Sequence, residues 1–371
     1  KNKEKFNEKW YLKSNPDVLK SGENAYEHYI HHGKSEGRRG TPETPFTILK
    51  KIKNKNMKIS TILKKSYIIY RESGIKGLKE KIKNLDIQIL SISTSYDKWI
   101  ELYDTLSVED MVEIKEEINN FSFNPLISIV MPTYNTNPKF LRQALDSIKD
   151  QIYENWELCI ADDASTNKEV KQLLNEYKIN DKRIKIIFRD KNGHISQASN
   201  SALEIVTGEY VALMDHDDLL PKHALYMVAL EINRKKGNLD LIYTDEDKID
   251  GDNKRYDPYF KMDWNSTLIN SQNFVAHLGV YRTAILKKIG GFREGFEGSQ
   301  DYDMVLRLTE KAEKIVHIPK ILYYWRVHAG SVAQNLSVKQ YAVDAAIKAI
   351  SDQLKRSGEK GTVKCNLPYE T

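Results

Sequence analysis

The stretch EYVALMDHDDLLPKHALYMVALEINRK, residues 209–235, holds the pattern that decides the fold. It opens with a short apolar run that reads as a buried strand. It closes with apolar residues at three- and four-residue spacing, which predicts an amphipathic helix. Three carboxylates, Asp215, Asp217 and Asp218, lie between the two patterns. Like charges gathered at a strand end cost free energy unless something cationic neutralises them, so this junction is the first candidate for a functional site.

The same alternation of apolar runs and amphipathic segments extends over residues 126–245. Short, continuous apolar strands that alternate with amphipathic helices indicate a mostly parallel sheet with helices on both faces. The expected fold class is therefore α/β, with a Rossmann-like sheet. The expected strands are residues 126–132, 156–162, 184–190, 209–215 and 239–245, and the expected helices are residues 138–151, 167–178, 196–206 and 221–235.

Four of the five expected strands end in polar side chains. Because open α/β sheets bind ligands outside the carboxyl ends of their strands, we expect these groups to converge on one edge of the sheet. They are residues 133–135, 162–163, 215–218 and 245–247.

Spacing alone leaves three roles open for the acidic cluster 215–218. Asp218 could cap the helix that follows, since Asp is a favoured N-cap residue. Two neighbouring carboxyl groups could share a proton, as acid–base pairs do. The oxygens could also bind a hard divalent cation such as Mg²⁺ or Mn²⁺, which prefers oxygen ligands.

Six motifs, read in their order along the chain, narrow this choice. Together they resemble the GT-A-fold glycosyltransferases of family 2, bacterial enzymes that move a sugar from a nucleotide diphosphate to an acceptor. The resemblance covers residues 126–335, somewhat over half of the chain. The motifs are ISIVMPTYN, CIADDAS, RDKNGHISQASNSAL, GEYVALMDHDD, GSQDYDMVLRL and YYWRVHAGS.

The resemblance implies a divalent ion, Mn²⁺ or Mg²⁺, that bridges a carboxylate and both phosphates of the donor. Such an ion stabilises the charge that builds on the leaving diphosphate. The motifs make Asp217 the direct metal ligand and place His328 where it can reach the metal or the diphosphate. Asp215 would face the ribose.

The resemblance also implies a nucleotide-binding edge. The turn after the first strand would clasp the base, and Asp162 would contact it with support from Asp163. Gly193 would let the backbone approach the donor, and Arg189 could pair with a phosphate or with an acid of the cluster. The full set expected to bind the donor is Pro132, Thr133, Tyr134, Asn135, Asp162, Asp163, Arg189, Asn192, Gly193, Asp215 and His216.

Inverting sugar transfer needs a general base that takes the proton of the acceptor hydroxyl. The resemblance gives this role to Asp301, although a carboxylate in the first turn of a helix is also stabilised there without any catalytic duty. The family pattern has Glu before the base, whereas this chain has Gln300. The residues expected on the acceptor side are Asp245, Trp264, His277 and Gln300.

The expected function is therefore metal-dependent, inverting transfer of a sugar from a UDP-sugar, with dTDP-rhamnose as a second donor candidate. The acceptor would be a glycan, lipid-linked or protein-linked, in bacterial polysaccharide or glycoconjugate synthesis. Two rivals stay open. A catalytically degenerate GT-A domain could act as a binding or scaffold module, which Gln300 favours, and a glycoside hydrolase could use two carboxylates without nucleotide.

The sequence divides into four regions by composition. Residues 1–45 resemble a small helical module attached to bacterial glycosyltransferases, and residues 46–122 read as a basic and then acidic helical linker. Residues 123–335 form the expected GT-A catalytic domain. Residues 336–371 are expected to form a C-terminal helix and tail packed on it.

The net charge of +5 conceals a strongly basic stretch. Residues 46–85 carry twelve Lys and Arg against two Glu. Lys-rich helices with interleaved Ile and Leu can lie on an anionic membrane surface, and a solvated linker helix is the alternative. Few aromatic residues and no groove-reading motif accompany the stretch, so nucleic acid is not an expected partner.

The remaining composition favours a cytoplasmic setting. No apolar run approaches the roughly 20 residues that span a bilayer, and no signal-peptide pattern opens the chain. The two cysteines provide no disulfide framework. The expected location is the cytoplasm, with peripheral contact at the inner face of the membrane if residues 46–85 bind lipid.

Overall fold

The computed structural model describes residues 24–33, 96–328 and 340–365, together with positions 11, 12, 15 and 18. Contacts between Cα atoms divide the chain into two units, residues 1–105 and 106–371. Each unit is described by itself. The basic stretch 46–85 lies outside the described residues, so its membrane or linker role stays a prediction.

The first unit contains short helical pieces. Asn24 caps helix α3 (Ala25–His28), because its side chain accepts hydrogen bonds from the backbone of the next turn. The helix continues as a π-turn, η1 (Tyr29–Gly33). Tyr11, Val18 and Ala25 form a small buried cluster. Helix α7 spans Tyr96–Tyr103.

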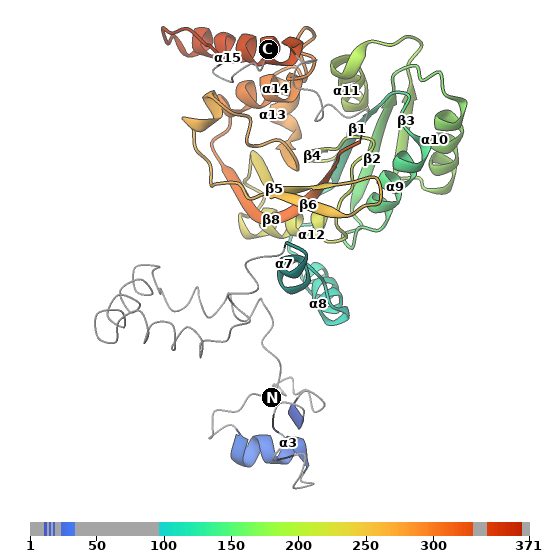
Figure 1. The fold of residues 1–371 in the computed structure, drawn as a ribbon, viewed down its shortest axis with the longest axis vertical. Helices are drawn as coiled ribbons and strands as arrows, with labels where there is room; N and C mark the ends of the chain where they lie inside the picture. Colours follow the sequence, from blue (N-terminus) through green and yellow to red (C-terminus); the bar gives the residue numbers. More distant parts are fainter. Residues whose placement is uncertain are drawn as a thin grey trace, which may run out of the picture. The chain divides into compact units, whose positions relative to one another are not determined.

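The second unit is built on one eight-stranded sheet (Figure 1). The strand order is β3-β2-β1-β4-β7-β5-β6, and β8 pairs with β5. Strands β1 to β4 are mutually parallel, as are β5 and β8, whereas β7 runs antiparallel to both β4 and β5. The strands are β1 (Ile127–Thr133), β2 (Trp156–Asp162), β3 (Ile184–Phe188), β4 (Tyr210–Leu213), β5 (Leu241–Ile249), β6 (Arg255–Tyr259), β7 (Gly279–Arg282) and β8 (Ile315–Arg326).

Helices begin where the sequence offers capping side chains. Asn137 accepts a hydrogen bond at the start of α9, and Pro138 occupies the first helical position, where its missing N–H costs nothing. Ser107 and Asp110 form a capping box at α8. The helices are α8 (Val108–Asn119), α9 (Pro138–Lys149), α10 (Lys168–Asn180), α11 (His194–Glu204), α12 (Ala224–Arg234), η2 (Leu268–Asn270), α13 (Thr283–Lys288), α14 (Gln300–Thr309) and α15 (Gln340–Ser357).

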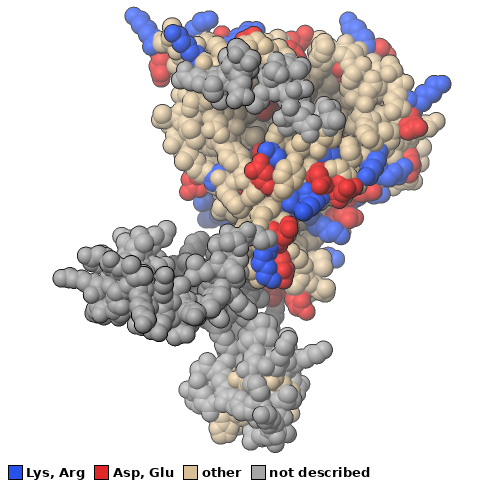
Figure 2. Space-filling model, in the orientation of Figure 1, with Lys and Arg blue, Asp and Glu red and all other residues tan. Residues whose placement is uncertain are grey.

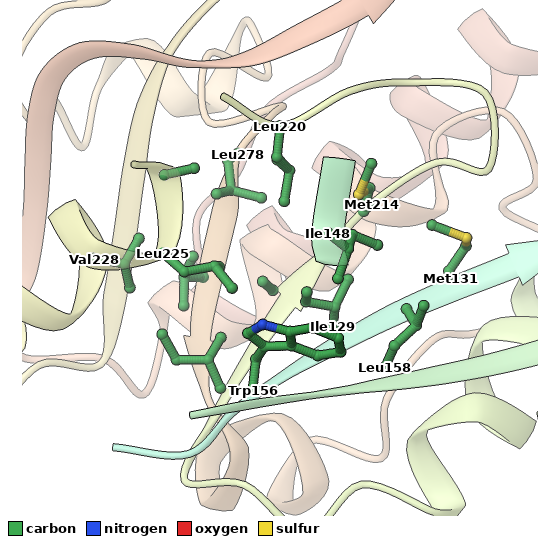
Figure 3. Packing of buried hydrophobic residues seen from close by; sticks show 14 of the residues in the cluster. Ile129, Met131, Ile148, Trp156, Leu158, Met214, Leu220, Leu225, Val228 and Leu278 are labelled. Carbon is green, nitrogen blue, oxygen red and sulfur yellow. The ribbon is translucent and has the colours of Figure 1, made fainter. Parts of the chain in front are cut away.

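Two hydrophobic clusters cover the two faces of the sheet. In β1, Ile129 and Met131 belong to the cluster with α9, α10 and α12, whereas Val130 belongs to the cluster with α11, α14 and α15. The reason for this division is that successive side chains of a strand point to opposite faces of the sheet. Figure 3 shows part of the first cluster, with Trp156 beside Ile129 of β1 and with Leu225 and Val228 of α12 in the same cluster. The expected α/β class with helices on both faces is confirmed.

The periodicity did not indicate β6, β7 and β8. Strand β7 has only four residues, too few to show a period, and it inserts antiparallel between β4 and β5. On the face drawn in Figure 2, acidic and basic side chains of the described part mix over the second unit. No helix within the described residues has both the length and the apolar character to cross a membrane.

Candidate active site

The strand register brings the expected polar groups to one edge of the sheet. Thr133, the last residue of β1, pairs with Asp162, the last residue of β2. The N–H of Asp163 donates to the Thr133 carbonyl oxygen over 2.8 Å. Nδ1 of His216 lies 3.1 Å from the Pro132 carbonyl oxygen. Because β4 pairs in parallel with β1, the acidic cluster that follows β4 lies at the same edge.

Asp217 and His328 form the candidate metal pair. Nε2 of His328 lies 2.8 Å from Oδ2 of Asp217, with the two side chains 29% and 19% exposed. A backbone bridge between Leu219 and Tyr324 aligns the two segments that carry them. Two ligands bound side by side on Mg²⁺ at about 2.1 Å would be about 3 Å apart, so this separation fits such an ion.

The two candidate protein ligands, Asp217 and His328, also suit a metal ion that is shared with a substrate. Within the described residues, no group of three or more His, Cys, Asp or Glu side chains is arranged to hold a metal. Mg²⁺ commonly keeps several waters and is held by one or two carboxylates plus substrate phosphates. One carboxylate and one imidazole are therefore sufficient if a diphosphate completes the coordination.

Asp218 has a structural role. It is 1% exposed, its Oδ2 accepts a hydrogen bond from the Tyr323 hydroxyl, and its Oδ1 accepts one from the Arg326 backbone N–H. Burial, followed by the charges of Asp217 and Asp215, raises the pKa of Asp218 well above its usual range. The suggestion that Asp218 caps the next helix is wrong, because α12 begins after His223.

The side chain of Arg326 places a positive charge next to the acidic cluster 215–218. It is fully buried, and its Nε donates to the Asp217 carbonyl oxygen over 2.6 Å. Its other guanidinium nitrogens reach Gln143, the Asp250 carbonyl and Asn253. Burial lowers the pKa of Arg326, and Asp218 is the leading charge that opposes this. No role was expected for Arg326, because local sequence does not show that an arginine will be buried.

At the neighbouring strand end, Asp163 and Arg189 pair. Nε of Arg189 lies 2.8 Å from Oδ1 of Asp163, and both side chains are largely buried. The Gly193 N–H donates to the same carboxylate, and the Asn192 amide donates to the Asp163 carbonyl. A Cβ at Gly193 would lie 2.0 Å from Oε1 of Gln197, so a larger residue at this position would have to displace that side chain. The acid that pairs with Arg189 is thus Asp163, not a member of the cluster 215–218, and pairing of Arg189 with a phosphate stays a prediction.

The turn after β1 is held by Asn135, whose φ is +44°. Its side-chain oxygen accepts hydrogen bonds from the N–H groups of Thr166 and Asn167. Among the described residues, Oδ1 of Asp162 and Oγ1 of Thr133 are buried side-chain oxygens without a hydrogen-bond partner. Buried polar atoms usually find partners, so these two fit a site that a nucleotide completes. Tyr134 is 47% exposed at the same edge.

Asp301 lies in the first turn of α14, as the sequence predicted. Nδ2 of Asn273 donates to its Oδ2 over 2.9 Å. Burial raises the pKa of Asp301, and the charge of His277 opposes this. Gln300 accepts a hydrogen bond from the Gly298 N–H. The nearby Asp303 is fully buried between arginines and serves the packing of α14.

The residues expected on the acceptor side occupy different environments. Asp245 is 3% exposed and bonds to the Lys261 N–H and to His317, so its carboxylate is used within the fold. Trp264 packs against Phe274 at the edge of the second core cluster. His277 stacks on Tyr323 with 4.6 Å between ring centroids, and its Nε2 lies 3.9 Å from Oδ2 of Asp215. Of these, His277 lies beside the acidic cluster.

A family model described as "Glycosyl transferase family 2" matches residues 128–290. The chain is also 30% identical over 209 residues to the uncharacterized glycosyltransferase MJ1057 of Methanocaldococcus jannaschii, covering 55% of this chain and 71% of that protein. This chain belongs to glycosyl transferase family 2. The expected family is confirmed.

Two further relatives are much longer than the matched region. An uncharacterized protein of Sinorhizobium fredii, y4gI, is 46% identical over 249 residues, which is 67% of this chain but 27% of that protein. The O-antigen biosynthesis protein RfbC of Myxococcus xanthus is 35% identical over 256 residues, 69% of this chain and 20% of that one. The chain thus spans about a quarter of these relatives or less.

Among solved structures, S. aureus TarS in complex with UDP-GlcNAc is similar to this chain. The TM-score is 0.51 with 24% sequence identity, over 62% of this chain and 66% of the TarS chain in that structure, which comprises residues 1–349. This likeness shows a shared GT-A fold. It agrees with the sheet and the helix layers of the second unit.

Proposed function

We propose that this family 2 member transfers a sugar from a nucleotide diphosphate sugar to a glycan acceptor in bacterial polysaccharide or glycoconjugate synthesis. The observation that carries the proposal is the 2.8 Å approach of Asp217 and His328 beside the carboxyl ends of β1, β2 and β4. The O-antigen biosynthesis protein RfbC among the relatives supports the polysaccharide setting.

Asp217 and His328 would hold Mn²⁺ or Mg²⁺, which when bound supplies positive charge to the leaving diphosphate. Arg326 fixes this pair by bonding the Asp217 carbonyl, so the ligand geometry is set before the donor arrives. The buried oxygens of Asp162 and Thr133 would accept hydrogen bonds from the nucleotide, and Asp215 would face the ribose. The Asp163–Arg189 pair holds the neighbouring loop in place.

Asp301 would act as the general base. As the acceptor oxygen attacks the anomeric carbon, its proton passes to the Asp301 carboxylate and the sugar–phosphate bond breaks, with the electron pair leaving on the diphosphate. Attack opposite the leaving group inverts the anomeric centre. The Asn273 hydrogen bond to Oδ2 orients the carboxylate for this step.

A thermal-shift screen tests the donor and the metal together. TarS, which shares the fold, was solved with UDP-GlcNAc, so UDP-sugars come first and dTDP-rhamnose second. Ligand that binds only the native state raises the melting temperature. We expect the largest rise with nucleotide sugar and Mn²⁺ together. Asp217→Ala should remove the part that depends on Mn²⁺, whereas the exposed Asp344→Ala on α15 should keep it.

The same screen, together with activity assays, distinguishes the proposed transferase from the two alternatives, a scaffold module and a glycoside hydrolase. A nucleotide sugar that raises the melting temperature without any sugar transfer to glycan acceptors would favour the scaffold reading. Release of sugar from a polysaccharide in the presence of chelator and without nucleotide would support a glycoside hydrolase. Absence of any shift with every nucleotide sugar, with and without Mn²⁺, would contradict the proposed function.

A further inference from the structure

The ring of Phe140, in the first turn of α9, contacts both Arg326 and the proposed metal ligand His328. Its centroid lies 5.4 Å from the centroid of the His328 ring, with 38° between the two planes. The guanidinium carbon of Arg326 lies 4.5 Å from the same Phe140 centroid. One half-buried aromatic side chain thus joins the two residues that contact Asp217.

These contacts close a ring of four residues around the candidate metal pair. Nε of Arg326 donates to the Asp217 carbonyl oxygen over 2.6 Å, and Oδ2 of Asp217 lies 2.8 Å from Nε2 of His328. The His328 ring packs on Phe140, and Phe140 packs on Arg326. The four residues come from α9, from the segment after β4 and from the end of β8. Each of them is therefore held by two of the others.

Arg326 gives the Phe140 ring a fixed neighbour. The guanidinium is buried, and its Nη2 donates to Oε1 of Gln143 over 3.0 Å. Gln143 comes three positions after Phe140, and residues at this spacing lie on the same face of a helix. That face of α9 therefore holds one guanidinium twice, by the hydrogen bond to Gln143 and by the cation–π contact with Phe140. The position of the Phe140 ring is set by α9 and by Arg326 together.

The side chain of His328 lies two positions beyond the last residue of β8 and is 29% exposed. An imidazole at such a place has several staggered side-chain conformations, and in this one Nε2 lies beside Asp217. Packing on Phe140 favours this orientation, because rotation of the ring away from Asp217 also breaks the contact with Phe140. A ligand side chain that is ordered before the ion arrives loses less conformational entropy on binding.

We propose that Phe140 is a positioning residue for the metal site: it holds the His328 imidazole in the orientation that binds the ion together with Asp217. Phe140 acts through His328. The inference rests on the proposed function for the role of His328 as a metal ligand. The orientation of the His328 ring is observable without metal, without donor and without sugar transfer.

The first experiment follows the His328 ring in the metal-free full chain by NMR. Histidine is labelled with ¹³C at Cε1, and His328→Gln assigns the signal among the nine histidines. Phe140→Leu keeps an apolar side chain but removes the ring current, so the His328 signal should move toward its random-coil position. Phe140→Tyr keeps the ring and should leave the signal near its wild-type position. A His328 signal that does not move in Phe140→Leu would overturn the proposal.

The second experiment measures Mn²⁺ binding by electron paramagnetic resonance of the free ion, with UDP or dTDP present to supply the diphosphate. Phe140→Leu should weaken Mn²⁺ binding by about 3- to 10-fold, the size expected for the loss of one aromatic pair. Phe140→Tyr should retain the wild-type affinity. The affinity for either nucleotide without metal should stay unchanged in both variants.

The matched control is Phe121→Leu, which removes another half-buried ring, one that packs on Tyr153 and Tyr226 instead. It should keep the wild-type affinity for Mn²⁺. Equal weakening in Phe121→Leu and Phe140→Leu would show a general loss of stability and would contradict the proposal. Should thermal unfolding show that Phe140→Leu has lost the fold, Phe140→Met takes its place.

A double-mutant cycle decides whether Phe140 acts through His328. His328→Ala should weaken Mn²⁺ binding, and the addition of Phe140→Leu should weaken it no further. Additive losses would contradict an action through His328. Failure of the proposed function looks different: a wild-type chain that binds no Mn²⁺ with either nucleotide would contradict the metal site itself. Mn²⁺ binding that Phe140→Leu leaves intact would contradict only the role of Phe140.

Discussion

Nε of the buried Arg326 donates a 2.6 Å hydrogen bond to the backbone carbonyl of Asp217, the residue proposed to bind the metal. Its backbone N–H meanwhile holds the carboxyl group of Asp218. One residue of β8 thus holds the segment that follows β4, which lies more than one hundred positions earlier in the chain. The geometry of the acidic cluster depends on this contact.

Replacing this arginine should therefore destabilise the whole unit. Arg326→Met leaves the carbonyls of Asp217 and Asp250 and the side chain of Asn253 without their donor. An unsatisfied buried group costs about 1–3 kcal/mol, and Asp217 and Asp250 are partly buried whereas Asn253 is exposed, so we expect about 1–3 kcal/mol lower free energy of unfolding in urea titrations. Arg234→Met, which breaks a solvent-exposed pair, should change it by less than about 1 kcal/mol. Equal effects of the two variants would contradict this assignment.

We expect the buried carboxylate of Glu157 to make the free energy of unfolding depend on pH. Burial would raise its pKa, but hydrogen bonds from Lys185, Ser128 and Thr207 lower it from 4.5 to about 2. Because the folded-state pKa lies below the unfolded one, the stabilisation is present above about pH 4.5 and is lost as the pH falls toward 2. Glu157→Gln should cost about 2–3 kcal/mol at pH 7, and the difference from wild type should shrink in acid.

Chemical denaturation at several pH values measures this difference. The control is Glu176→Gln, whose exposed pair with Arg142 is 3.3 Å long and should contribute less than about 1 kcal/mol. A difference between wild type and Glu157→Gln that stays constant from pH 7 to pH 3 would show that Glu157 is not ionised in its buried network.

We expect substitutions at Gly193 and Gln197 to affect each other, because the two residues are in close contact. A Cβ at Gly193 would meet Oε1 of Gln197 and Nη2 of Arg189, so Gly193→Ala should displace the glutamine and loosen the Asp163–Arg189 pair. We expect a loss of about 1–3 kcal/mol in stability and weaker nucleotide binding. Because the obstacle is the end of a flexible side chain, adding Gln197→Ala should recover part of both losses. A double-mutant cycle measures the recovery, and strict additivity would contradict the clash.

Asp301→Asn should separate binding from chemistry. Removing a general base costs about 10²- to 10⁴-fold in kcat. Asparagine keeps the shape of the side chain, so nucleotide-sugar affinity measured by calorimetry should stay unchanged. The exposed Asp344→Asn on α15 provides the matched control and should retain wild-type kcat. A variant with Asn at 301 that turns over at the wild-type rate would remove Asp301 from the mechanism.

Much of the fold follows from local pattern. The apolar runs that predicted five strands correspond to β1 to β5, and the helical spacing predicted α9 to α12, with boundaries that differ by a few residues. The strands β6, β7 and β8 were missed. Strand β7 takes its place from antiparallel pairing with β4 and β5, which no local period encodes.

The sequence by itself determined that acidic groups would follow the strands and gather at one edge, because strand ends and parallel order are legible from periodicity. Only the tertiary structure decided which side chains face them. His328 reaches Asp217 from 111 positions away, Arg326 lies beneath the cluster, and His277 is fixed by Glu246. The reason is physical: the charge state of a buried group depends on burial and on neighbours brought in from distant strands, and neither is a property of the local sequence.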